Sequence, residues 1–276
     1  MRKFYLFLKW FIGVLFIFNV GFIYEAIGAK VYKIEDTIED IVENKNYRPI
    51  KIVDIQQTKD GGLIFAGTVE RSKNRDIFVL KLDANDKVNW MKIYRGRYDD
   101  GLSAIQQTND GGYIIVGKTN SFGTGYYTGK ENYDILLLKL DEKGNIIWQK
   151  TYGKVTSDEK AITIKQTADG GYIVGGVVEE FGKTIIWILK LDANGKVVWH
   201  NFYGSHKNEC GIRSIQQTKD GGYIVTGGVI LSGSTVGALI FKLDAKGNLI
   251  WERYYKSAKS DDFLSSFYLI ENIQQT

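Results

Sequence analysis

Short hydrophobic runs separated by turn residues fill the chain after residue 50, and residues 98 to 154 show the pattern most clearly. The four runs of this stretch are Leu102 to Thr108, Tyr113 to Lys118, Tyr133 to Leu140, and Asn145 to Tyr152. The turns inside the first pair and the last pair contain Asp, Gly and Asn, which tolerate the backbone of tight hairpins. The third run is apolar on both faces, as in a strand that lies between two other sheets. The pattern predicts a unit of four antiparallel strands, named A to D.

This unit recurs four times, and each copy carries two motifs. Ile-Gln-Gln-Thr-x-Asp-Gly-Gly, with Lys165 for the first Gln in the third copy, ends strand A and forms the A/B turn. Its turn aspartates are Asp60, Asp110, Asp169 and Asp220. Lys-Leu-Asp ends strand C, and strand D then supplies the tryptophans Trp90, Trp148, Trp199 and Trp251, each followed four residues later by a tyrosine. A fifth copy begins at Ile273, and a repeat of 50 to 59 residues indicates a propeller or a solenoid.

A lone four-stranded sheet could not cover two apolar faces, whereas sheets stacked radially cover one another. We therefore predict an all-β protein, a β-propeller of four-stranded antiparallel blades with four full repeats. The expected blades span about residues 51–97, 98–154, 155–205 and 206–268, with the start of the next at 269–276. Because the fifth copy stops one residue before its hairpin turn, we expect an incomplete ring.

The segment Leu191 to Trp199, Leu-Asp-Ala-Asn-Gly-Lys-Val-Val-Trp, resembles the strand C to D signature of pyrroloquinoline-quinone-type propeller repeats. In that family the tryptophan docks each blade against its neighbour, so the resemblance implies this structural role for the four repeated tryptophans. The turn lacks the family's usual Thr and is one residue shorter, so the resemblance implies the fold and not the cofactor. Thr-x-Asp-Gly-Gly is also similar to the Asp-box hairpin of sialidase-type propellers, which implies structural turns at the four repeated aspartates.

The N-terminus has the pattern of a secretory signal peptide. Three basic residues up to Lys9 precede an apolar run from Trp10 to Tyr24, and small residues follow at Ala26 and Gly28. We expect a signal peptide at residues 1–28 and a secreted, periplasmic or cell-surface protein; the alternative is an uncleaved membrane anchor. Residues 29–50 form an N-terminal segment whose isoleucines fall at near-helical spacing, which predicts a short helix.

Composition and charge narrow the range of partners. The 276 residues are 44% hydrophobic and 25% charged, as in ordinary globular proteins, and the net charge is only +4, half of it in the leader. Nucleic acid is therefore not an expected partner. The single Cys210 excludes an intramolecular disulfide and lies far from the leader, which excludes a lipid-anchored start. Cys210, His200 and His206 are close in sequence, but two histidines and one thiol are a weak signal for a metal site, so we expect no bound metal. We expect no cofactor either.

Loop lengths vary at one end of the repeats only, in the B/C loops and the D/A loops, and this end is the candidate binding surface. An inserted loop in the second copy carries Phe122, Tyr126 and Tyr127, which could stack on a sugar or grip a peptide, or could pack on their own blade. Acidic pairs recur in the D/A loops, and the candidates among them are Asp99, Asp158 and Asp261. They could recruit a cation, or they could cap the starts of strands.

These patterns favour an exported, non-catalytic module that binds or scaffolds a glycan, a peptide or a partner at the cell surface. No catalytic residue is expected, because no Ser-His-Asp order, Walker loop or HExxH helix is present. The alternatives are a sialidase-like glycosidase, whose arginine cluster finds no equivalent repeat positions here, and a quinoprotein dehydrogenase, which would need vicinal cysteines. A periplasmic scaffold that resembles outer-membrane assembly propellers is a further alternative, although no lipobox is present.

Overall fold

The computed structural model describes residues 48–71, 74–124, 132–180, 182–204, 210–230 and 236–256. The chain divides into two compact units, Met1–Pro49 and Ile50–Thr276, and the description below concerns the second. The expected leader and the start of a fifth repeat lie outside the described residues, as does the expected N-terminal segment 29–50 except for residues 48–50, which are strand rather than helix. Among the residues described, no helix has the length and apolar character needed to cross a membrane.

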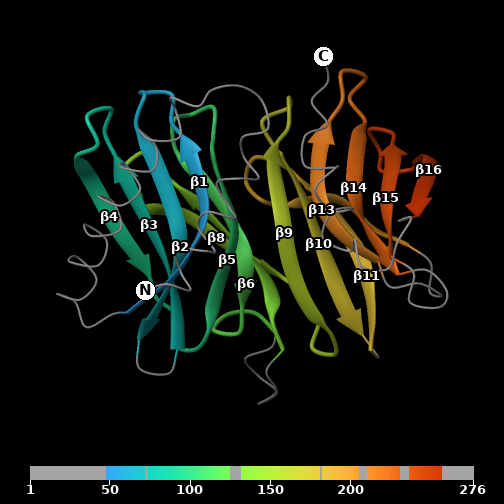
Figure 1. Ribbon diagram of the computed structural model, residues 1–276, viewed down its shortest axis with the longest axis horizontal. Helices are drawn as coiled ribbons and strands as arrows, with labels where there is room; N and C mark the ends of the chain where they lie inside the picture. The colour runs from blue at the N-terminus through green and yellow to red at the C-terminus, as the bar shows by residue number, and fades with distance from the viewer. Residues whose placement is uncertain are drawn as a thin grey trace. The chain divides into compact units, whose positions relative to one another are not determined.

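In the described part of the second unit, sixteen β-strands form four four-stranded sheets, and in each sheet the strands follow one another antiparallel in chain order (Figure 1). The first sheet contains β1 (Arg48–Gln57), β2 (Leu63–Arg71), β3 (Asn74–Leu82) and β4 (Val88–Tyr94). The second contains β5 (Asp100–Gln107), β6 (Tyr113–Thr119), β7 (Asp134–Leu140) and β8 (Ile146–Tyr152). The third contains β9 (Asp158–Gln166), β10 (Tyr172–Glu180), β11 (Lys183–Leu191) and β12 (Val197–Tyr203). The fourth contains β13 (Cys210–Gln217), β14 (Tyr223–Ile230), β15 (Val236–Leu243) and β16 (Leu249–Lys256). The prediction of an all-β protein with four sheets of four antiparallel strands is confirmed.

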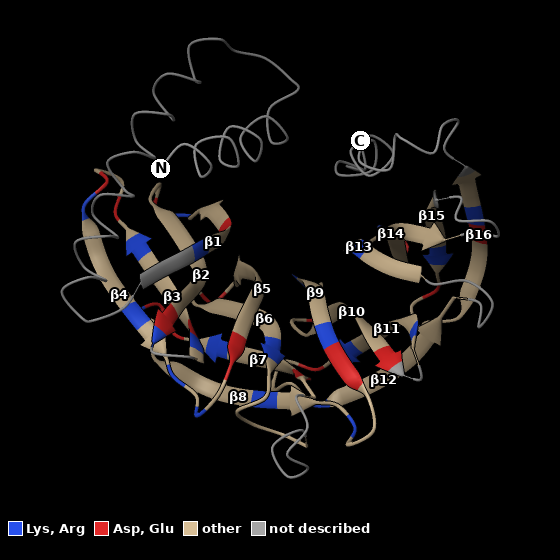
Figure 2. Ribbon diagram, turned by 60° about the horizontal axis from the view of Figure 1, so that its bottom comes forward, with Lys and Arg blue, Asp and Glu red and all other residues tan. Residues whose placement is uncertain are grey.

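Apolar side chains fill the space between consecutive sheets, which lie side by side in chain order (Figure 2). Strand β7 shows why the third run of the repeat is apolar throughout. Ile135 and Leu137 join the core shared with the third sheet, whereas Leu136 and Leu138 join the core shared with the first. A strand that is buried on both sides loses any alternation of polar and apolar residues. Truncation of one such leucine to alanine costs about 2 to 5 kcal/mol of stability.

Each strand C pairs with its strand D through a register shift at the Lys-Leu step of the repeat. The lysine just before the shift lies opposite the repeated tryptophan, as Lys81 lies opposite Trp90 and Lys139 opposite Trp148. The shift is a β-bulge, which turns the local side chains and ends regular pairing. The two halves of the second sequence motif are therefore cross-strand partners.

Candidate functional site

The two ends of the sheets differ in construction. One end, the turn face, consists of the A/B and C/D turns at 58–62, 83–87, 108–112, 141–145, 167–171, 192–196, 218–222 and 244–248. The other end, the loop face, consists of the B/C and D/A segments, described at 95–99, 120–124, 132–133, 153–157 and residues 182 and 204. Segments of the two types are bonded to one another there: Asn74 Nδ2 donates to Arg97 O at 2.7 Å, and Tyr98 N donates to Ser121 Oγ at 2.9 Å.

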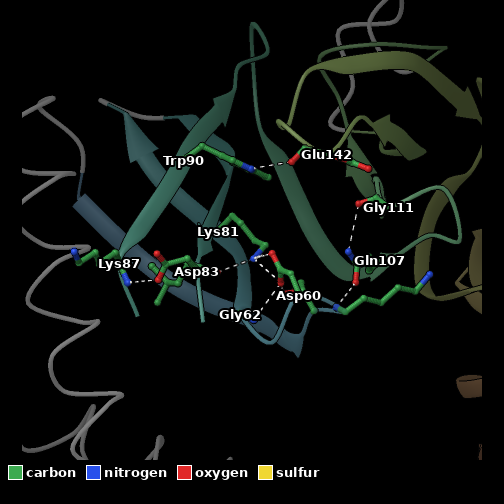
Figure 3. Close-up of polar contacts among 12 residues, drawn as sticks. Asp60, Gly62, Lys81, Asp83, Lys87, Trp90, Gln107, Gly111 and Glu142 are labelled. Carbon is green, nitrogen blue, oxygen red and sulfur yellow. Dashed lines mark hydrogen bonds and ion pairs between the residues drawn. The ribbon is translucent and has the colours of Figure 1, made fainter. Parts of the chain in front are cut away.

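The repeated turn aspartates act as acceptors inside the turn face. Asp60 accepts hydrogen bonds from Thr58 Oγ1 at 2.5 Å, from Gly62 N at 3.1 Å and from Lys81 Nζ at 2.9 Å (Figure 3). Lys81 and Thr58 hold the pKa of the Asp60 carboxyl at about 2, below its usual value. The same lysine–aspartate pair recurs at Asp110, Asp169 and Asp220. Each pair joins the A/B turn to the end of strand C of the same sheet.

Three of the four repeated tryptophans lie between sheets on the side of the turn face. Trp90 Nε1 donates to Glu142 O of the next sheet at 3.0 Å (Figure 3), and Trp199 Nε1 donates to Ala245 O at 3.2 Å. Trp148 packs against the core between the second and third sheets. These three side chains are half-buried, whereas Trp251 on β16 is exposed.

The predicted rim acids make backbone contacts. Asp99 Oδ1 accepts from Arg75 N at 2.8 Å, and its Oδ2 pairs with the Arg75 guanidinium at 2.9 Å. Although burial opposes it, this guanidinium lowers the pKa of Asp99. At the equivalent place in the next repeat, Asp158 Oδ1 accepts from Tyr133 N at 3.0 Å. Both carboxylates thus bond the residue that precedes the strand C acid, while Asp261 lies outside the described residues.

Four further carboxyl groups at the loop face are buried: Asp76, Asp100, Asp134 and Glu159. The sequence analysis did not single out Asp76 and Asp134, and it treated Asp100 and Glu159 only as second members of the acidic pairs. Asp76 and Asp134 stand near the start of strand C, each seven residues before the Asp of Lys-Leu-Asp. This spacing is the signal that could have revealed them. Figure 2 shows acidic residues on β5, which begins at Asp100, and on β9, which begins at Asp158.

The carboxyl groups of Asp134 and Glu159 both lie around Gly153. A side-chain carbon at Gly153 would lie 2.2 Å from Asp134 Oδ1 and 2.7 Å from Glu159 Oε2, so only glycine leaves room for the two carboxyl groups. Thr124 donates to Asp134 through its backbone N and its hydroxyl, and Ser157 donates to Glu159 Oε1.

Ionising both the Asp134 and the Glu159 carboxyl groups would place two negative charges close together in a buried site, which costs free energy. Glu159 Oε2 has no hydrogen-bond partner although it is buried. Burial raises the pKa of Glu159 to about 7, and the negative charge of Asp134 adds to the rise. Burial likewise raises the pKa of Asp100 to about 6. The arrangement favours a protonated carboxyl that is held within the protein. Within the described ranges no group of three or more His, Cys, Asp or Glu side chains could hold a metal ion.

The loop face also places a half-buried cation against an aromatic ring. Lys118 Nζ lies 3.6 Å from the centroid of the Tyr133 ring, and burial lowers the pKa of this lysine. Phe122, predicted to bind ligand, is half-buried against the core between the first and second sheets, which is the local packing that the sequence analysis kept as its alternative. Tyr126 and Tyr127 lie outside the described residues.

No known family model matches this chain, and no curated protein matches it. Among solved structures it is similar to "the crystal structure of endo-arabinase from Bacteroides thetaiotaomicron VPI-5482", with 11% identity, a TM-score of 0.47, and coverage of 77% of this chain and 81% of that chain. It is also similar to a "hypothetical protein from leishmania major", with 10% identity, a TM-score of 0.29, and coverage of 78% and 98%. At these scores the function has to be argued from the residues of the chain itself.

Proposed function

We propose that this chain is an exported β-propeller whose loop face binds an acidic glycan, an acidic peptide or a similar surface partner without catalysing a reaction. Four successive antiparallel sheets that share their cores in chain order support the propeller. The leader pattern supports export. In this proposal the four sheets are part of a larger ring.

One observation carries the binding proposal: the loop face exposes cations beside aromatic rings, whereas five of its described carboxyl groups are buried or ion-paired. They are Asp76, Asp99, Asp100, Asp134 and Glu159. The Arg97 guanidinium lies 5.5 Å from the ring centroid of Tyr98, and Lys154 Nζ lies 5.7 Å from that of Phe202. All four of these side chains are exposed. Cations held over rings attract an acidic partner, and the rings offer apolar area for stacking.

The same burial argues against glycoside hydrolysis at this face. That reaction needs two carboxyl groups that flank the bound sugar. In the described part of this face the neighbouring carboxyl pairs are Asp76 with Asp100 and Asp134 with Glu159, and none of the four is more than 2% exposed. A substrate could not reach them without opening the contact between neighbouring sheets.

An array of acidic and neutral glycans and peptides tests the proposal. Binding should prefer acidic probes, weaken with added salt, and fall about tenfold in Lys154→Ala, which corresponds to the loss of one well-placed contact. Lys143→Ala removes the same charge from an exposed site on the turn face and should bind normally. An equal loss in Lys143→Ala would move the site away from the loop face, and turnover in sialidase or quinone-dependent oxidation assays would replace the non-catalytic proposal.

A separate pair of variants tests whether the aromatic residues of the inserted loop contribute to binding. A double change of Tyr126 and Tyr127 to alanine should lower affinity if these rings contribute to the site. Phe122→Ala serves as the contrast, because Phe122 packs against the core and its truncation should lower stability by about 2 kcal/mol or more. Thermal unfolding of both variants separates a binding defect from a folding defect.

A further inference from the structure

One docking device joins each of the first three sheets to the next. A tyrosine near the end of strand D donates its hydroxyl to the carbonyl of a glycine in the following C/D turn. The pairs are Tyr94 with Gly144 at 2.8 Å, Tyr152 with Gly195 at 2.5 Å, and Tyr203 with Gly247 at 2.6 Å. The repeated tryptophan of the same strand D covers the same turn.

Glycine is required at the receiving position. A side-chain carbon at Gly144 would lie 2.7 Å from Trp90 Cζ3, and one at Gly247 would lie 2.8 Å from Trp199 Cζ3. Both glycines also adopt positive φ, 74° and 82°. The tryptophan ring therefore lies flat on backbone that only glycine presents at such short range.

The fourth sheet also has a tryptophan and a tyrosine on its strand D, but no C/D turn among the described residues lies against them. Trp251 and Tyr255 of β16 are 40% and 50% exposed, whereas their counterparts in the other sheets are half-buried. The contact made by the Trp251 ring is with the guanidinium of Arg253 on its own strand, 5.5 Å from the ring centroid. Trp251 and Tyr255 are called the docking pair below.

The first sheet cannot receive the docking pair of this chain or of a second copy. Its C/D turn has Asp86 where the other three turns have glycine, with a φ of 62°. The side chain of Asp86 would occupy the space that a tryptophan ring fills at Gly144. The other three turns already hold tryptophans, and Ile273 to Thr276 repeats the Ile-Gln-Gln-Thr start of the first motif.

We propose that the docking pair of β16 receives the glycine-bearing C/D turn of a further repeat that continues from Ile273 to Thr276, and that Asp86 excludes the first sheet from this role. The occupant is thus a turn of the form Asp-x-x-Gly with its glycine at positive φ and its carbonyl toward Tyr255. This assignment is independent of what the loop face binds.

The test extends the full chain beyond Thr276 with a copy of its own residues Lys219 to Lys256, which contain a complete C/D turn. Trp251 is monitored as the fluorescence difference between each chain and its Trp251→Phe variant. With the glycine turn, the Trp251 emission should shift to the blue and its quenching by acrylamide should fall severalfold. In a matched extension whose copy of Gly247 is changed to Asp, Trp251 should be quenched as in the unextended chain. Equal protection by the two extensions would overturn the proposal.

A second measurement needs no extension and remains decisive if the longer chain does not fold. In the 276-residue chain, the quenching of Trp251 should not change with protein concentration, because Asp86 keeps the first sheet of a second copy from docking. Protection of Trp251 that grows with concentration, together with self-association that Trp251→Ala abolishes, would contradict the exclusion.

Discussion

Lys190 Nζ lies 2.8 Å from Asp169 Oδ2, although the lysine side chain is only 6% exposed and the aspartate is 62% exposed. The ammonium also donates to Leu191 O at 3.0 Å. The charge that the fold must keep partnered is therefore the lysine, which is the buried member of the pair.

This asymmetry predicts different costs for the two partners. Asp169→Asn should lower the free energy of unfolding by about 1 to 3 kcal/mol, because it leaves a buried ammonium without its counter-charge. Lys190→Met should cost less, because it removes the buried charge and keeps a side chain of similar length. Urea unfolding of both variants measures the difference, and a larger loss in Lys190→Met would contradict this account.

The stability of the protein should also depend on the ionisation of Glu159. Its folded pKa of about 7 lies above the ordinary value of 4.5, so the folded state holds this proton more tightly than the unfolded state. The contribution is fully present below pH 4.5 and is lost as the pH rises toward 7. Glu159→Gln should remove this part of the pH dependence of Tm and should raise Tm at pH 8. Asp158→Asn, one residue away on the same strand, should leave the dependence in place.

Gly153→Ala tests whether the two carboxyl groups leave room for a side chain. The added carbon would lie 2.2 Å from Asp134 Oδ1, and the resulting overlap should cost about 1 to 3 kcal/mol. Gly211→Ala is the control, because an added carbon there meets no atom within 4 Å and the backbone has no positive φ. Its expected effect is within about 0.5 kcal/mol. Similar losses at both positions in denaturant melts would show that the carboxyl pair is not the cause.

Replacing the repeated tryptophan by alanine should lower the free energy of unfolding more in the first sheet than in the fourth. Trp90→Ala should cost about 2 to 4 kcal/mol, because the ring packs on Gly144 and against the core. Trp251→Ala should cost less than about 1 kcal/mol in the 276-residue chain, because its ring is exposed. Comparable losses of unfolding free energy would mean that Trp251 is already docked.

Much of the fold could be predicted from the sequence because the same apolar runs and turn residues recur in each repeat. The apolar run at Ile135 to Leu138 predicts a strand buried on both sides, and the turn residues around Asp110 predict the hairpin. The candidate site was harder to predict, because pairing across loops has no fixed spacing. The approach of Asp134 and Glu159 to Gly153 depends on how the second and third sheets pack. Phe122 has the sequence context of an exposed loop residue, although it packs against the core between the first and second sheets.

The register shift at the Lys-Leu step limits where the repeat can change length. It places the lysine that holds the A/B turn opposite the tryptophan that reaches the next sheet, as for Lys81 and Trp90. A residue inserted between them would separate an ion pair within one sheet from a contact between two sheets, and both would be lost. Insertions can accumulate only at the opposite end, so the protein has one end that can be lengthened or exchanged for new loops and one end that cannot.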